Sequence, residues 1–177
     1  MIVVTDRKRL VAALRQRGVD WLAPSDAQGA PLPDEMLIAS LATHDDPRLR
    51  QALIGLFLLQ PSLAIRVPHI VTDLDEQAAS ELKAFYTAAV YLQTMWRIRL
   101  ARYLPAMLEL PDYFSQTLSL PLPRDEYGKA GLYDLAQWHA SRARFPYNYV
   151  SAYAGVADLL FASLKVRHSF HESTTAR

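Results

Sequence analysis

Apolar residues recur every three or four positions through most of this sequence, which is the spacing of one face of an α-helix. Prolines and short polar stretches separate the periodic segments. Because no two segments alternate as paired strands would, we expect an all-α fold. The pattern predicts helices at about residues 7–17, 35–44, 47–60, 75–104, 132–144 and 149–167.

Several of these segments begin with residues that favour helix N-termini. Thr5 or Asp6 precedes the first helix, and Asn148 precedes the last. Asp46 is followed by Pro47, which suits the first helical position because its missing N–H has no partner there. Local capping therefore fixes the predicted starts.

The segment 75–104 is the longest element predicted, and it is apolar around most of its circumference. About 30 residues would make a helix roughly 45 Å long. A helix that is apolar nearly all round is packed on several sides, so we expect it at the centre of the fold. We read residues 65–73 as an extended connector around Pro68, and 105–131 as an irregular cover.

These elements predict a compact bundle of five or six helices, with helical hairpins packed round the long helix at about 75–104. The chain is long enough for one domain, which we place at residues 1–167. Residues 168–177 are expected to form a frayed C-terminal tail.

The stretch "DPRLRQAL" follows a sequence pattern that is common in one family of helical repeats. The order Asp-Pro-x-aliphatic-Arg-x-Ala is matched by Asp46, Pro47, Leu49, Arg50 and Ala52. Residues 34–64 thereby resemble a HEAT-type helical hairpin. HEAT proteins are generally scaffolds that present a surface to partners, so the resemblance implies two packed helices and an interaction role. No second copy occurs at the spacing of about 40 residues that stacked repeats require.

The composition is that of a soluble globular protein. Of 177 residues 51% are hydrophobic and 21% charged, which excludes a disordered chain and a membrane span. Nineteen basic and eighteen acidic residues leave a formal charge of +1, which gives nucleic-acid binding little support. With no cysteine and no secretory signal pattern at the N-terminus, we expect a cytoplasmic protein.

Three arginines near the end of the long predicted helix, Arg97, Arg99 and Arg102, stand among aromatic residues. At 100° per residue they point in three directions, so they cannot form one phosphate-binding strip. Cations at a helix C-terminus complement the helix dipole. Arg99 differs because it falls in the apolar stripe, and we expect it to form a structural ion pair or to anchor an interface.

The N-terminal segment is basic. Its cations could contact phosphate, or they could form the solvated face of an amphipathic helix. They are Arg7, Lys8, Arg9, Arg15 and Arg17.

The segment 142–153 joins two predicted helices and is rich in the residues that protein interfaces favour. We predict that it forms a partner-binding surface, and the alternative is that its rings fold back into the core. Its basic and aromatic residues are Arg142, Arg144, Phe145, Tyr147, Tyr149 and Tyr153.

The sequence predicts no catalytic residue, metal site or cofactor. His168, His171 and Glu172 have a spacing that could share a metal, but too few ligands for a site. His69 and His139 are single histidines in apolar settings, typical of the core. No nucleophile elbow, phosphate-binding loop or dinucleotide fingerprint occurs.

We therefore expect a non-enzymatic helical interaction or scaffold module that binds a protein partner or a second copy of itself. The three tryptophans, nine tyrosines and six phenylalanines favour an exposed apolar patch. One alternative is a nucleic-acid-binding accessory or regulatory subunit that uses the N-terminal arginines. A second is an enzyme whose site assembles from distant residues.

Overall fold

The computed structural model describes residues 3–22, 31–143 and 147–175, with side chains up to residue 170. These residues form helices and no strand, which confirms the all-α prediction. The expected five or six helices are too few, because the described residues contain eight α-helices and two 3₁₀-helices. They are α1 Arg7–Gln16, α2 Asp34–Thr43, α3 Pro47–Leu59, η1 Pro61–Arg66, α4 Val67–Asp73, α5 Glu76–Met95, α6 Arg97–Tyr103, η2 Asp125–Gly128, α7 Lys129–Arg142 and α8 Tyr149–Thr175.

Side-chain caps begin the helices where the sequence predicted them. Asp6 accepts a hydrogen bond from the backbone N–H of Lys8 at 2.9 Å. Asp46 accepts one from Arg48 at 2.9 Å, and Asn148 one from Ser151 at 3.1 Å. Each bond satisfies a backbone donor that has no partner inside its own helix.

The long helix predicted at about 75–104 is wrong, because the helix bends at Trp96. α5 ends at Met95, and Trp96 has φ −107° and ψ 17°, outside the helical range, before α6 begins at Arg97. The rings of Trp96 and Phe161 of α8 meet edge to face at 5.8 Å. The bend thus lets α6 pack on α8, a contact between distant segments that leaves no local sequence signal.

The extended connector predicted at 65–73 is also wrong, because Val67–Asp73 is the helix α4. Pro68 lies in its first turn, where a missing N–H costs nothing. Val67 and Ile70 are buried in the core, which explains the apolar sequence of this segment.

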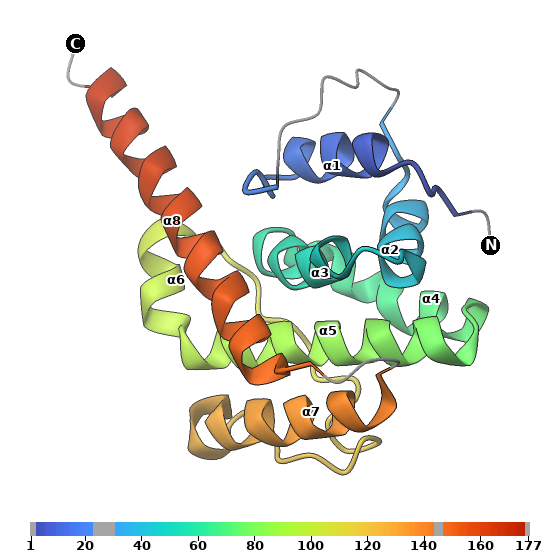
Figure 1. Ribbon diagram of the computed structural model, residues 1–177. Coiled ribbons are helices and arrows are strands. Elements are labelled where there is room, and N and C mark those ends of the chain that lie inside the picture. Colours follow the sequence, from blue (N-terminus) through green and yellow to red (C-terminus); the bar gives the residue numbers. More distant parts are fainter. Residues whose placement is uncertain (1–2, 23–30, 144–146, 176–177) are drawn as a thin grey trace.

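α5 lies at the centre of the fold, as the sequence predicted for this segment (Figure 1). It contacts α2, α3 and α4 on one side and α7 on the other. α8 crosses the ends of these layers and contacts α3, α6 and α7. The connection between α2 and α3 is short, and the two helices pack together. The site described below is built from residues of α3, α5, α7 and α8.

Side chains of α5 hold the irregular segment between α6 and α7 against the bundle. Tyr86 donates a hydrogen bond to the carbonyl of Pro111 at 2.7 Å, and Tyr91 donates one to that of Pro121 at 2.6 Å. Gln93 also bonds the backbone of this segment. These bonds give partners to backbone groups of a proline-rich segment that cannot form a regular helix.

α8 is the helix whose C-terminal part projects from the body in Figure 1. Its helical backbone continues to Thr175, through most of the segment that we expected to fray. Within the described residues, α8 from Tyr149 to Phe170 is long and apolar enough to pass a length and composition test for a membrane span, as is the bent pair of α3 with η1 and α4. Buried core helices pass the same test, and Tyr153 and Leu160 of α8 are buried in the bundle.

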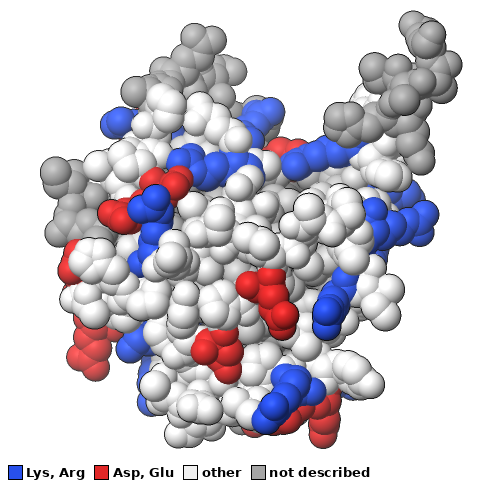
Figure 2. All heavy atoms as spheres, turned by 180° about the vertical axis from the view of Figure 1, so that it is seen from behind, with Lys and Arg blue, Asp and Glu red and all other residues white. Residues whose placement is uncertain are grey.

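Figure 2 shows one face of the molecule, with basic and acidic groups interspersed among many uncharged ones. The Lys and Arg groups lie mostly in the upper and right-hand parts of this face, and the Asp and Glu groups mostly to the left and below.

Candidate functional site

A buried carboxylate links three helices near one end of the bundle. Glu81 of α5 has a side chain only 8% exposed. Its Oε2 lies 3.1 Å from Nε of Arg50 in α3, and its Oε1 lies 3.3 Å from Nε2 of His139 in α7. These are ion-pair distances, but the N–H groups are not aligned for hydrogen bonds. Burial of such a charge is costly unless partners surround it.

His139 is held on every side. Its Nδ1 lies 2.7 Å from the hydroxyl of Tyr153, its ring stacks on Tyr149 at 3.8 Å, and Phe85 meets it edge to face at 5.0 Å. Burial, with the neighbouring Tyr149 and Glu81, raises the pKa of the Tyr153 hydroxyl well above its usual range. Tyr153 therefore keeps its proton and shares a hydrogen bond with Nδ1, while Nε2 faces Glu81.

The charge state of Glu81 follows from the competition between burial and its partners. Burial alone would raise the pKa of this carboxyl group, but the contacts with His139 and Arg50 outweigh it and hold the pKa below its usual value. Glu81 is therefore ionised at neutral pH.

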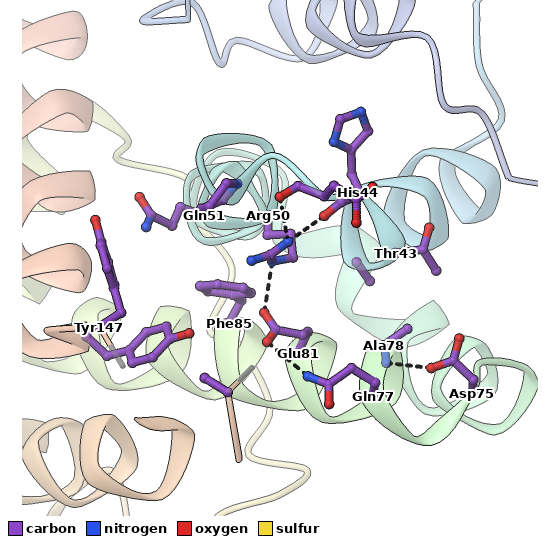
Figure 3. Close-up of a pocket in the computed structure, with 15 residues that line it drawn as sticks. Thr43, His44, Arg50, Gln51, Asp75, Gln77, Ala78, Glu81, Phe85 and Tyr147 are labelled. Carbon is purple, nitrogen blue, oxygen red and sulfur yellow. Dashed lines mark hydrogen bonds and ion pairs between the residues drawn. The ribbon is translucent and has the colours of Figure 1, made fainter. Parts of the chain in front are cut away.

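Arg50 joins this cluster to the end of α2. Its Nη1 donates hydrogen bonds to the carbonyl oxygens of His44 at 2.6 Å and Asp45 at 3.1 Å. Figure 3 shows the guanidinium between these carbonyl groups and the carboxylate of Glu81. Gln77 approaches Glu81 from the next turn of α5 at 3.5 Å. The guanidinium thus neutralises both Glu81 and the negative end of α2.

This cluster forms the floor of a cavity of about 640 Å³, which we call the large cavity. It is lined by residues 42–51 around the α2–α3 connection, by the first turns of α5, and by the segment leading into α8. Tyr147 lies on the side opposite the α2–α3 connection, and Tyr149 also lines the cavity.

A second concavity of about 440 Å³, the small cavity, lies between α7 and the start of α8. Tyr133, Gln137 and Val150 are among the residues that line it. Tyr147 and Tyr149 line both cavities, so they form the wall between them. We call the residues Tyr147, Asn148, Tyr149 and Val150 the 147–150 corner.

The structure divides the predicted partner-binding residues of segment 142–153. Tyr147 is 54% exposed, whereas Tyr149 is 7% exposed and Tyr153 is fully buried. Tyr153 therefore follows the core alternative and cannot contact a partner. Arg142 is exposed and places its guanidinium 4.4 Å from the ring centre of Trp138. Arg144 and Phe145 lie outside the described residues.

Arg99 makes neither an ion pair nor a buried contact with a carbonyl group among the described residues. Its guanidinium lies 3.8 Å from the ring centre of Phe161 and 5.7 Å from that of Trp96. The predicted structural ion pair is replaced by cation–π contacts between α6 and α8.

Two of the five N-terminal cations are engaged within the molecule. Arg7 pairs with Asp46 at 3.1 Å, and Arg17 pairs with Asp34 at 2.8 Å. The other three, Lys8, Arg9 and Arg15, are exposed on α1. Fewer cations than the sequence suggested are thus available for phosphate.

The described part of the chain contains no cluster of three or more candidate metal ligands. His168 meets the ring of Tyr103 edge to face at 5.7 Å. The side chains of His171 and Glu172 lie outside the described residues.

Sequence reasoning missed the three central residues of the site. In the sequence, Arg50 entered only as part of the HEAT-like motif and His139 only as a core histidine. One signal was present, because Glu81 lies four residues before Phe85 and so on the same helix face as that core residue. An acid on a buried face needs a partner, but the sequence does not say which one.

No model of a known protein family matches this chain, and no curated protein or solved structure shows significant similarity to it.

Proposed function

We propose that this protein is a non-enzymatic helical interaction module that binds a protein partner at the 147–150 corner and the cavities beside it. The observation that carries the proposal is the position of Tyr147, half-exposed between two concavities. Tyrosine is enriched among the residues that dominate binding energy in interfaces, and such residues cluster beside well-formed pockets. The partner can also be a second copy of this chain.

The polar cluster supports a binding role rather than a catalytic one. Both ring nitrogens of His139 face partners, Tyr153 on one side and Glu81 on the other, and the residue is only 1% exposed. A general base needs a nitrogen within reach of the substrate proton. The Arg50–Glu81 pair in turn fixes α2, α3 and α5 relative to one another, which gives the large cavity a rigid floor.

The size of the large cavity also supports binding. About 640 Å³ lies within the range of roughly 300–1,000 Å³ that is usual for ligand sites. A cavity of this size beside an exposed tyrosine can receive one or two side chains of a partner.

Affinity purification from the producing cells tests the proposal, with tagged wild type, Tyr147→Ala and Tyr127→Ala compared in parallel. Tyr127 is 80% exposed in η2, at the other end of α7, and serves as the matched control. We expect wild type and Tyr127→Ala to recover the same protein or a second copy, and Tyr147→Ala to recover at least about tenfold less, the loss typical of an interface anchor. A bare monomer from all three, or equal recovery, would contradict the proposal.

A further inference from the structure

The charges around the large cavity do not balance. Its lining includes the carboxyl groups of Asp45, Asp75 and Glu81 and, among the described residues, one guanidinium, that of Arg50. Arg50 already pairs with Glu81 and with two backbone carbonyl groups. Asp45 and Asp75, by contrast, form no ion pair with a side chain in the described part of the chain.

His44, which also lines the cavity, is engaged with the backbone rather than with Asp45 or Asp75. Its Nδ1 accepts the backbone N–H of Asp46 at 2.9 Å, so this nitrogen carries no proton. Its Nε2 lies 3.2 Å from the carbonyl oxygen of Thr5 and can donate to it. Both ring nitrogens thus face backbone groups.

The two aspartates lie where a ligand can meet them. Both residues are exposed. Asp75 uses Oδ1 to cap α5, accepting the N–H of Ala78 at 2.9 Å, and this bond leaves Oδ2 for another donor (Figure 3). Asp45 contributes its carbonyl group to Arg50 and has no side-chain ion pair among the described residues. Each can thus accept a hydrogen bond from a cation.

The aromatic wall suits the same kind of ligand. Tyr147 lines the side of the cavity opposite the α2–α3 connection, and Tyr149 and Phe85 also line the cavity. Tyr147 is the exposed ring of the three, and the face of such a ring attracts ammonium and guanidinium groups within about 6 Å of its centre. Burial and the nearby Glu81 raise the pKa of Tyr149 to about 12, so its hydroxyl group stays protonated and available as a donor or acceptor.

An anionic ligand fits this cavity less well. The guanidinium of Arg50 would have to leave Glu81, and the ligand would face Asp45 and Asp75. Like charges within one cavity oppose binding, whereas opposite charges guide association and set specificity.

We propose, on the basis of the proposed function, that the large cavity receives a lysine or arginine side chain from a basic segment of the protein partner. The carboxylates of Asp45 and Asp75 attract the cation by their opposite charge, and the ring of Tyr147 contacts it. The rest of the cavity holds the aliphatic stem of the side chain. The cavity is larger than one such side chain, which leaves space for a neighbouring residue of the segment.

Nuclear magnetic resonance titrations of the ¹⁵N-labelled full chain test this inference. The probes are three blocked tripeptides, acetyl-Ala-X-Ala-amide, in which X is lysine, norleucine or glutamate. We expect the lysine peptide to shift the amide signals of Gln51, Gln77 and Ala78 and to bind at least about tenfold more tightly than the norleucine peptide, a difference of about 1.4 kcal/mol. Equal binding of the lysine and norleucine peptides, or tighter binding of the glutamate peptide, would overturn the inference.

Two charge variants place the effect at the cavity. The first variant combines Asp45→Asn with Asp75→Asn, and we expect it to lose most of the preference for lysine. Asn is used because it can still cap α5 at position 75. Asp158→Asn, on the exposed face of α8, is the control and should leave the preference unchanged. If n-butylamine binds as tightly as the lysine peptide, the site takes a free amine and the assignment to a peptide is wrong.

The partner recovered by affinity purification separates this inference from the proposed function. If recovery depends on Tyr147 but not on Asp45 and Asp75, the cation inference fails while the interaction surface stands. If recovery is independent of Tyr147, the proposed function fails, whatever the tripeptides do.

Discussion

Oε1 of Glu81 lies 3.3 Å from Nε2 of His139, and this contact ties the central helix α5 to α7 beneath the large cavity. The other oxygen of the same carboxylate lies 3.1 Å from Arg50 of α3. One buried acid thus holds three layers of the bundle. The shape of the cavity floor depends on this acid, so its removal tests both stability and binding.

Replacing the carboxylate should destabilise the protein. Glu81→Gln leaves Arg50 without its charged partner, and breaking a buried pair in this way costs about 3 kcal/mol, the lower end of the usual range because Arg50 is 21% exposed. Chemical denaturation measures the change. Glu35→Gln is the control, since Glu35 pairs with Arg66 at 2.8 Å on the surface and its loss should cost below about 1 kcal/mol. Equal effects would show that Glu81 is not held as a buried pair.

The contribution of Glu81 should depend on pH. Its pKa is below the usual 4.5 in the folded protein, so the unfolded chain binds the proton more readily. The stabilisation is present above pH 4.5 and is lost as the pH falls through the folded pKa. Unfolding free energies of wild type and Glu81→Gln, measured from neutral to acidic pH, should differ by a constant amount above 4.5 and converge below it. A difference that stays the same in acid would contradict this assignment.

Glycine 131 should resist substitution although it lies inside a helix. A Cβ atom there would lie 2.3 Å from Cε1 of Tyr91, whose ring is fixed by the hydrogen bond to Pro121. Alanine gains about 1 kcal/mol of helix propensity, but overpacking costs about 1–3 kcal/mol, so we expect a net loss for Gly131→Ala. Gly155 in α8 has no atom within 4 Å of the same position, and Gly155→Ala should be stabilising. Thermal unfolding distinguishes the two variants, and stabilisation by both would refute the packing of Tyr91 on α7.

The contact between α6 and α8 should depend on Arg99 and not on Arg97. Arg99 lies 3.8 Å from the ring centre of Phe161, and an exposed cation–π contact contributes about 0.5–1 kcal/mol. Arg97, in the same short helix, is exposed and makes no ion pair or ring contact within the described residues. Denaturation of Arg99→Ala and Arg97→Ala should show a loss for the first only. A similar loss for both would assign the effect to the charge of α6.

Local signals in the sequence predicted the parts of the fold that depend on local chemistry. Asp6, Asp46 and Asn148 cap helices where expected, because a cap and the backbone N–H that it accepts lie within a few residues of each other. The bend at Trp96 was not predictable in this way. It accompanies a contact with Phe161, which is distant in the sequence.

The candidate site shows the same division. The segment 142–153 was recognisable by its tyrosines and arginines, but its sequence did not show that Tyr147 faces solvent while Tyr153 bonds His139. The Arg50, Glu81 and His139 cluster joins three helices, and each residue alone had an ordinary local explanation. Only the packing of α3, α5 and α7 brings their charges together.

Hydroxyl-radical footprinting of the purified protein, free and in the complex recovered from the producing cells, tests the interaction surface most directly. Tyr147 and Tyr127 are both exposed, at 54% and 80%, so we expect both rings to react with the radical in the free protein. In the complex we predict strong protection of Tyr147 and an unchanged rate at Tyr127. If Tyr147 is oxidised in the complex as fast as in the free protein, while another surface such as α1 is protected, the assignment of the 147–150 corner as the binding surface is contradicted.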